Sequence, residues 1–272
     1  MKKRLVFFTF IPIIFASIKA IFDTNVFKVN SVHFLSNKLP KGSKITILQI
    51  SDLHNKEFGE NNQKLLYTAE KLNPDIIVMT GDLISRGTKQ FERVFSFVEK
   101  LTSVHESVYF VSGNHEWDNP RIQEFFDGLK VRKVTILDNQ HTIVTKNEVK
   151  LHLIGVGDCS TDHENTDKAF DGIDQERYTI LLSHSPSITK KYSGLPADLV
   201  LSGHTHGGQV RIPLIGAVVA PEQKLFPNLD KGTFKTGQDQ MLYIDSGLGT
   251  SKAPIRFLNQ SQISFIQITS DS

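Results

Sequence analysis

Three strand and helix pairs follow one another in the first half of the chain, and this alternation constrains the fold more than any other feature. Strands that alternate with helices form parallel or mixed sheets with helices packed on their faces. Short apolar runs predict buried strands at 44–52, 74–82 and 107–116. Amphipathic spacing predicts helices at 62–72, at 91–101 and within 120–130.

The second half of the chain is richer in strands and has little helix among them. Apolar or alternating runs predict strands at 134–139, 141–147, 150–158, 178–185, 197–203, 241–247 and 263–269. These strands are too many for one small helix-covered sheet. We therefore predict an α/β fold with two packed mixed β-sheets flanked by helices.

Length, charge and cysteine content limit the kinds of site that the chain can carry. The 272 residues, 39% of them hydrophobic, are enough to bury a full core. The formal net charge is +2, and no single-sign field indicates a nucleic-acid-binding surface. Cys159 is the only cysteine, so a disulfide framework and a Cys-rich zinc module are excluded. A metal site must therefore use His and carboxylate ligands.

The N-terminus has the composition of a targeting segment. Three basic residues at 2–4 precede an apolar run over 5–18, which is typical of a signal peptide or an anchor. Lys19 and Ile18 stand where a cleavage site would need small residues, which favours an uncleaved membrane anchor over 1–22. A cleaved signal peptide and a buried first helix are the alternatives. By the positive-inside rule, the rest of the chain is expected outside the cytoplasm, anchored to the cell membrane or secreted.

The domain itself is predicted to begin after a short connecting segment. Residues 23–43 have mixed composition and contain Pro40 and Gly42, which mark a turn, so we expect a linker there. Residues 44–272 are then expected to form one domain, since no internal repeat or low-complexity segment divides them.

Residues of metal-ligand type follow five of the predicted strands. In an open α/β sheet, ligands bind beyond the carboxyl ends of the strands, so residues far apart in sequence can meet there. Each residue alone is more often a helix cap, a turn former or a structural histidine. The whole set is hard to explain in that way. Its members are Asp52, His54, Asp82, Asn114, His115, His184, His204 and His206.

The residue types indicate which metals would fit. Neutral imidazole nitrogens together with carboxylate oxygens suit divalent transition metals, whereas a Ca²⁺ or Mg²⁺ cage would use mostly oxygens. The pairs Asp52-x-His54 and His204-x-His206 have a spacing of two, which directs both side chains of an extended segment the same way. Gly203, in the same stretch, allows the backbone to approach a ligand closely.

The ordered motifs "DLH", "GDL", "GNHE", "SH" and "GHTHGG" resemble those of the calcineurin-like metallophosphoesterase family. The match runs from about Lys44 to the C-terminus. The stretches "LSGHTHGGQ" and "GLGTSKAPIRF", together with the N-terminal apolar segment, are similar to a bacterial membrane-anchored branch that includes enzymes hydrolysing UDP-diacylglucosamine.

The resemblance implies a role for each residue of the set. It implies two divalent ions (Mn, Fe or Zn) that activate water for in-line attack on phosphorus. His115 would act as general acid or charge stabiliser near the leaving group. Asp82 would bridge the ions. The first ion would be held by Asp52, His54 and His206, and the second by Asn114, His184 and His204.

One position departs from the family pattern. Many relatives have an aspartate where this chain has Ser85, and that aspartate often pairs with the histidine that corresponds to His115. Either Glu116 or Asp118 substitutes for it, or His115 has a lower pKa. Arg86 is expected either to bind phosphate or to lie in a solvated loop.

The sequence therefore predicts a metal-dependent phosphoric-ester hydrolase, a phosphodiesterase or phosphatase. Its expected partners are the membrane and a phosphoester substrate, with one linked to a lipid or to the cell envelope among the candidates. The alternatives are a non-catalytic metal-binding scaffold and a metalloprotease or amidohydrolase. The last of these is disfavoured because the chain lacks an "HExxH" motif.

Overall fold

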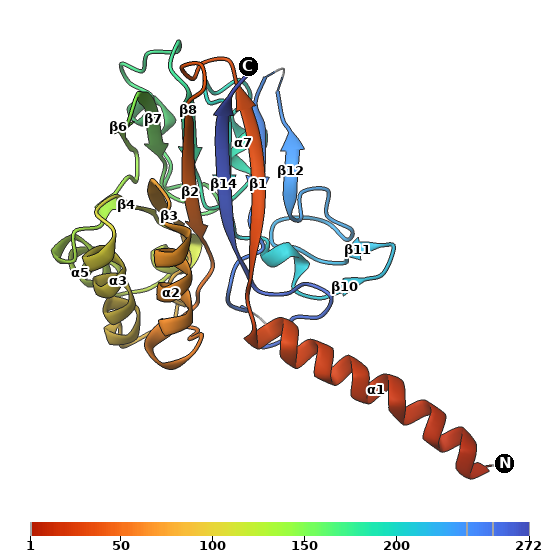
Figure 1. The fold of residues 1–272 in the computed structure, drawn as a ribbon. Helices are drawn as coiled ribbons and strands as arrows, with labels where there is room; N and C mark the ends of the chain where they lie inside the picture. The colour runs from red at the N-terminus through yellow and green to blue at the C-terminus, as the bar shows by residue number, and fades with distance from the viewer. Residues whose placement is uncertain (1, 238, 252, 272) are drawn as a thin grey trace.

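Two six-stranded sheets pack face to face, and helices cover their outer faces (Figure 1). The computed structural model describes residues 2–237, 239–251 and 253–271, and for residues 2–11 it describes the backbone alone. Each sheet combines parallel and antiparallel pairs. The prediction of two mixed sheets flanked by helices is confirmed.

The first sheet contains the three strands predicted from the strand and helix alternation. Its order is β1 (Lys28–Ser36), β14 (Gln262–Ser270), β2 (Lys44–Ile50), β3 (Ile76–Thr80), β4 (Val108–Val111) and β5 (Thr135–Ile136). The helical segments of this half are η1 (Glu60–Asn62), α2 (Gln63–Leu72), α3 (Glu92–Val104), α4 (Asn114–Trp117) and α5 (Ile122–Val131). Strands β2 to β5 are parallel, so their carboxyl ends meet at one edge.

The second sheet is built from the later strands. Its order is β12 (Gly232–Lys235), β13 (Met241–Ile244), β9 (Leu199–Ser202), β8 (Thr179–Leu182), β7 (Val149–Gly155) and β6 (Gln140–Lys146). The remaining elements are α6 (Thr166–Ala169), α7 (Ile188–Lys191), η2 (His206–Gly208) and a small hairpin of β10 (Arg211–Ile212) and β11 (Gly216–Ala217). Strands β7, β8, β9 and β13 are parallel.

Apolar side chains form three layers of core. One layer lies between the sheets and joins residues such as Ile47 and Val78 to Leu182 and Leu201. A second layer packs the outer face of the first sheet against α2, α3 and α5. The third packs the outer face of the second sheet against α6 and α7. Strands buried on both faces explain why the sequence shows continuous apolar runs rather than alternation.

The segment expected to be a linker contains a strand instead. β1 pairs in parallel with β14 from Lys28 to Ser36, at the edge of the first sheet. The expectation of a linker over 23–43 is wrong for these residues. The expectation failed because β1 is a half-exposed edge strand, where polar residues are tolerated and the apolar signal in the sequence is weak.

Helix α1 (Lys2–Asn25) projects away from the body of the protein (Figure 1). Its last turn is tied to the domain, since buried Asp23 accepts hydrogen bonds from the backbone N–H groups of Asn259 (3.3 Å) and, through its carbonyl, of Ser261 (2.8 Å). In the part of the chain that the structure describes, no helix combines the length and the apolar character needed to cross a membrane.

Candidate metal centre

The loops after β2, β3, β4, β8 and β9 bring the predicted ligand residues into one cluster. Two groups have donor atoms that all lie within 4.8 Å of one another, and Asp82 belongs to both. The structure thus places together all seven residues that the resemblance implied as ligands. The groups are Asp52, His54, Asp82 and His206, and Asp82, His184 and His204, which Asn114 joins through His204.

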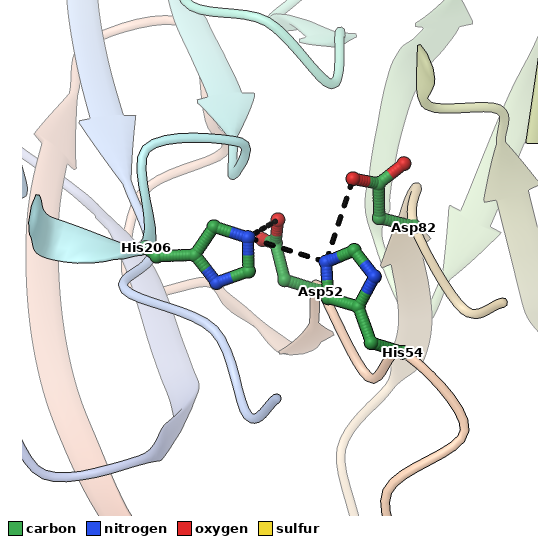
Figure 2. A group of neighbouring side chains, drawn as sticks. All are labelled: Asp52, His54, Asp82 and His206. Carbon is green, nitrogen blue, oxygen red and sulfur yellow. Dashed lines mark hydrogen bonds and ion pairs between the residues drawn. The ribbon is translucent and has the colours of Figure 1, made fainter. Parts of the chain in front are cut away.

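The first group converges on a point between the two sheets, as Figure 2 shows. His54 Nε2 lies 3.2 Å from His206 Nε2 and 3.6 Å from Asp82 Oδ2. His206 Nε2 lies 3.5 Å from Asp52 Oδ1. Burial lowers the pKa of His54 to about 3, so its imidazole is neutral and has a lone pair available.

The second group lies on the other side of Asp82. Its atoms are as close as those of the first group: His184 Nε2 lies 3.3 Å from Asp82 Oδ2, and His204 Nδ1 lies 3.2 Å from His184 Nε2 and 3.1 Å from Asn114 Oδ1. Burial opposes a charge on His184, but the Asp82 carboxylate outweighs it and raises the pKa of His184 well above its usual value. The negative charge of Asp82 therefore stabilises a positive charge within this group.

The spacing of these atoms fits a bound ion. Donors about 2.1 Å from one ion in tetrahedral geometry lie about 3.4 Å apart. The contacts in the first group span 3.2 to 3.6 Å and those in the second span 3.1 to 3.3 Å. The donor set of imidazole nitrogens with carboxylate and amide oxygens suits divalent transition metals. The residues present therefore fit a binuclear metal site.

The backbone is strained at most of these positions. Five of the residues have φ between 49° and 69°, a region that non-glycine residues seldom adopt and that Asp, Asn and His tolerate best. Such strain persists where the surrounding structure enforces it, and it gathers at functional sites. The five are Asp52, His54, Asp82, His204 and His206.

Glycines stand where a neighbouring backbone touches a ligand. A Cβ on Gly113 would lie 2.3 Å from Asp82 Oδ1, and a Cβ on Gly203 would lie 2.4 Å from Asp52 Oδ2. Any side chain at either position would displace a carboxylate of the cluster. This close approach explains the glycines of the "GNHE" and "SGHTH" stretches.

Buried Glu116 ties two of the ligand loops together. Its carboxylate accepts hydrogen bonds from the backbone N–H groups of Asp82 (2.8 Å), Ile84 (3.2 Å) and Gly113 (2.8 Å). The carboxylate is therefore occupied by these backbone groups. Of the two expected substitutes for the aspartate missing at position 85, Glu116 is excluded.

His115 faces Arg86 rather than a carboxylate. The Arg86 backbone N–H donates to His115 Nδ1 (3.2 Å), and Arg86 Nη2 lies 3.3 Å from Nε2. Asp118 contacts Arg86 Nη1 at 3.3 Å. Burial lowers the pKa of His115 and Arg86 lowers it further, although Asp82 opposes them. Ser85 instead places its hydroxyl 3.4 Å from His54 Nδ1.

Glu222 is a site residue that no sequence motif indicates. Its Oε1 lies 3.1 Å from His204 Nε2, and its Oε2 accepts a hydrogen bond from Ser185 (3.0 Å). Burial opposes ionisation, but contacts with His204 and Ser185 lower the pKa of Glu222 to about 2. The ionised carboxylate thus fixes the ring of His204 with Nδ1 toward the cluster.

A cavity of about 660 Å³ opens over the cluster. Buried Asp82, His204 and His206 line this cavity together with Arg86, His115 and Glu222. The remaining lining residues are Ser85, Asn114, Asp118, Ser160, Thr161, Pro221 and Ser251. This volume leaves room for a phosphate and for a sizeable group attached to it.

Comparison with known proteins shows which family the chain matches. Residues 45–208 match the family described as calcineurin-like phosphoesterase. The chain is 27% identical to the uncharacterized metallophosphoesterase YkoQ of Bacillus subtilis (strain 168), over 95% of this chain and 96% of that protein.

Two other proteins are similar to this chain over little more than half of their own length. A Danio rerio protein named transmembrane protein with metallophosphoesterase domain is 28% identical over 88% of this chain and 56% of its own length. The structure of a 5'-nucleotidase precursor from Thermus thermophilus has a similar fold, with a TM-score of 0.50 at 14% identity over 84% of this chain and 54% of that one.

Proposed function

The chain belongs to the calcineurin-like phosphoesterase family, and we propose that it hydrolyses phosphoric esters, as a phosphodiesterase or phosphatase, at the metal centre described above. The observation that carries this proposal is the position of Asp82 in both ligand groups. A carboxylate has two oxygens, so one aspartate can be shared by two ions about 3.5 to 4 Å apart. Ions in such a site make water nucleophilic near neutral pH and neutralise charge that builds on phosphoryl oxygens.

The ligand assignment follows the two groups of atoms. One ion would be held by Asp52, His54 and His206, with Asp82 shared. The other would be held by Asn114, His184 and His204, again with Asp82. His184 Nδ1 lies 2.8 Å from the carbonyl of Thr80, which leaves Nε2 free to face the cluster.

We expect Glu222→Gln to weaken binding of the second ion about 10- to 100-fold, because the neutral amide orients His204 less firmly. Metal affinity is measured by competition with a chromogenic chelator. Glu124→Gln, in an exposed ion pair on α5, is the matched control and should leave affinity unchanged. Equal affinities in the wild-type protein and Glu222→Gln would show that the contact with His204 has no effect on the metal.

His115 and Arg86 are placed to act on the substrate. Both line the cavity, and His115 lies against the first group, with its ring centroid 4.6 Å from that of His54. We propose that His115 protonates the leaving-group oxygen and that the guanidinium of Arg86 binds a phosphate oxygen. A substrate anion in the cavity would compete with Asp118 for Arg86.

Removing the charge of Arg86 is expected to change the pH dependence of hydrolysis. Arg86 lowers the pKa of His115, so Arg86→Gln should raise that pKa toward its ordinary value. Protonated His115 then persists to higher pH, so the decline of kcat/KM on the basic side of the pH profile moves to higher pH. Arg86→Lys keeps the charge and is the control. If the basic limb of the Arg86→Gln profile stayed at the wild-type pH, His115 could not be the general acid.

The function is tested with the full chain, stripped of metal and resupplied with Mn²⁺, Zn²⁺ or Fe²⁺. Turnover of bis-p-nitrophenyl phosphate or p-nitrophenyl phosphate that returns with metal supports the proposal. The ratio of diester to monoester turnover then separates a phosphodiesterase from a phosphatase. Folded protein that binds two ions and turns over neither ester would favour the alternative, a non-catalytic metal-binding scaffold.

We propose a membrane-associated role, with the catalytic domain outside the cytoplasm, because basic residues at 2–4 precede the apolar run of the N-terminal helix. Ile13, Phe15, Ile18 and Ile21 on α1 are all more than half exposed. We propose that this apolar surface attaches the protein to the cell membrane, and that the substrate is a lipid-linked or cell-envelope phosphoester. Recovery of the protein in the membrane fraction of its own cells, lost on Ile18→Asp with Ile21→Asp, is the test.

A further inference from the structure

A second apolar surface, distinct from that of α1, lies beside the cavity. We define the hairpin face as residues 210–217, which contain the β10–β11 hairpin, the following loop at 218–226 and the segment at 255–258. Leu214, at the tip of the hairpin, is fully exposed, and its neighbour Ile215 is 58% exposed. The other exposed apolar residues of this face are Val210, Ile212, Val219, Leu225, Phe226, Ile255 and Leu258. None of them belongs to the three core layers.

The parts of the hairpin face are joined to one another. The Arg211 N–H donates to the carbonyl of Phe257 (3.0 Å), and the Phe257 N–H donates to the carbonyl of Gln209 (3.1 Å). Leu258 lines a shallow hollow together with residues 211–216. The Phe226 N–H donates to the carbonyl of Val218 (2.9 Å), which folds the loop back on itself. The segments that carry these apolar side chains are therefore joined to one another through their backbones.

The hairpin face adjoins both the base of α1 and the cavity. The Arg256 N–H donates to Thr24 Oγ1 of α1 (2.8 Å), and Figure 1 shows the hairpin and α1 on the same side of the body. At the other end, Pro221 and Glu222 of the loop line the cavity. A flat partner that covers the hairpin face would thus meet the apolar side chains of α1 and the mouth of the cavity together.

The shape and composition of the face favour lipid as that partner. Its most exposed residue, Leu214, is aliphatic and stands at the tip of the hairpin, whereas protein interfaces concentrate energy in aromatic and Arg side chains that fill pockets. Exposed Lys224 stands next to Leu225 and Phe226 in the chain, as basic residues flank the apolar side of segments that lie in a membrane interface. The hairpin face and α1 lie on the same side of the body, so one bilayer surface can contact both.

We propose that the hairpin face inserts into the surface of a lipid bilayer and holds the cavity mouth against the lipid headgroups. The substrate class that fits this arrangement is a phosphoester carried in the headgroup of a membrane lipid. This substrate assignment rests on the proposed function, whereas the docking of the hairpin face does not.

The docking is tested with full-length Leu214→Cys carrying a polarity-sensitive fluorophore. Cys159 is buried and burial raises its pKa to about 11, so it reacts slowly with the label. The control is the same label on Val131→Cys, because Val131 is the last residue of α5 and is 79% exposed. With vesicles of phosphatidylcholine and phosphatidylglycerol in equal parts, emission from position 214 should shift to the blue and be quenched by lipids brominated in the acyl chain. Emission from position 131 should not change.

A label at 214 that behaves like the label at 131 would overturn the proposal, even if α1 carries the protein to the vesicles. A blue shift without vesicles that grows with protein concentration would also overturn it and indicate contact with a second copy of the chain. Leu214→Asp with Ile215→Asp should weaken binding of the full chain to the vesicles, measured as the fraction of protein that floats with them, and leave turnover of bis-p-nitrophenyl phosphate unchanged. If the wild-type chain inserts into the vesicles but does not turn over bis-p-nitrophenyl phosphate, the proposed function is wrong and the docking of the hairpin face still holds.

Discussion

Asp82→Asn is expected to lower kcat by at least about a thousandfold, the largest loss among single substitutions in the site. The carboxylate contacts His54 of one group and His184 of the other, so its loss weakens both groups at once. The amide keeps the shape of the side chain but has only one oxygen and no charge. Metal content per chain, measured by elemental analysis after dialysis, should fall from two ions to one or none.

The control for Asp82→Asn is Asp162→Asn, in an exposed ion pair with Lys191 outside the cavity. It should keep wild-type turnover and both ions. Thermal unfolding in the presence of a chelator shows whether either variant has lost its fold. If Asp82→Asn were folded, bound two ions tightly and turned over substrate normally, Asp82 could not be the shared ligand.

The cluster was predictable because parallel strands align their carboxyl ends. Asp52, Asp82 and Asn114 follow neighbouring strands of one sheet, and His184 and His204 follow neighbouring strands of the other. Strong apolar runs identify each of these strands, so the residues after them could be expected at one edge. That the two edges face each other is a property of sheet packing, which the strand pattern alone does not contain.

The residues that support the cluster were not predictable in this way. Glu222 follows no strand, and only the fold of the loop after β11 brings it to His204. Glu116 stands in the expected "GNHE" stretch, yet its bonds run to backbone N–H groups, which have no sequence signature. β10, β11 and β12 are short and partly exposed, so their residues show neither alternation nor a long apolar run.

Arg256 is expected to contribute more to stability than any other single charged residue outside the cluster. It is fully buried, and its guanidinium donates to the carbonyls of Ser246 (2.6 Å) and Gly249 (2.7 Å). Burial lowers the pKa of Arg256 to about 10, so the group stays charged at neutral pH. It lies beside the segment that carries His206, whose carbonyl is 3.5 Å from Nη1.

Arg256→Met is therefore expected to lower the free energy of unfolding by about 3 to 5 kcal/mol, because the methionine fills space but leaves buried carbonyls without donors. Urea unfolding in the presence of a chelator measures this loss without any contribution from bound metal. Arg93→Met, whose charge is largely exposed, should change stability by less than about 0.5 kcal/mol. Because Arg256 supports the loop of His206, the ion of the first group should be lost before that of the second. A stable Arg256→Met protein with both ions retained would show that water replaces the guanidinium at these carbonyls.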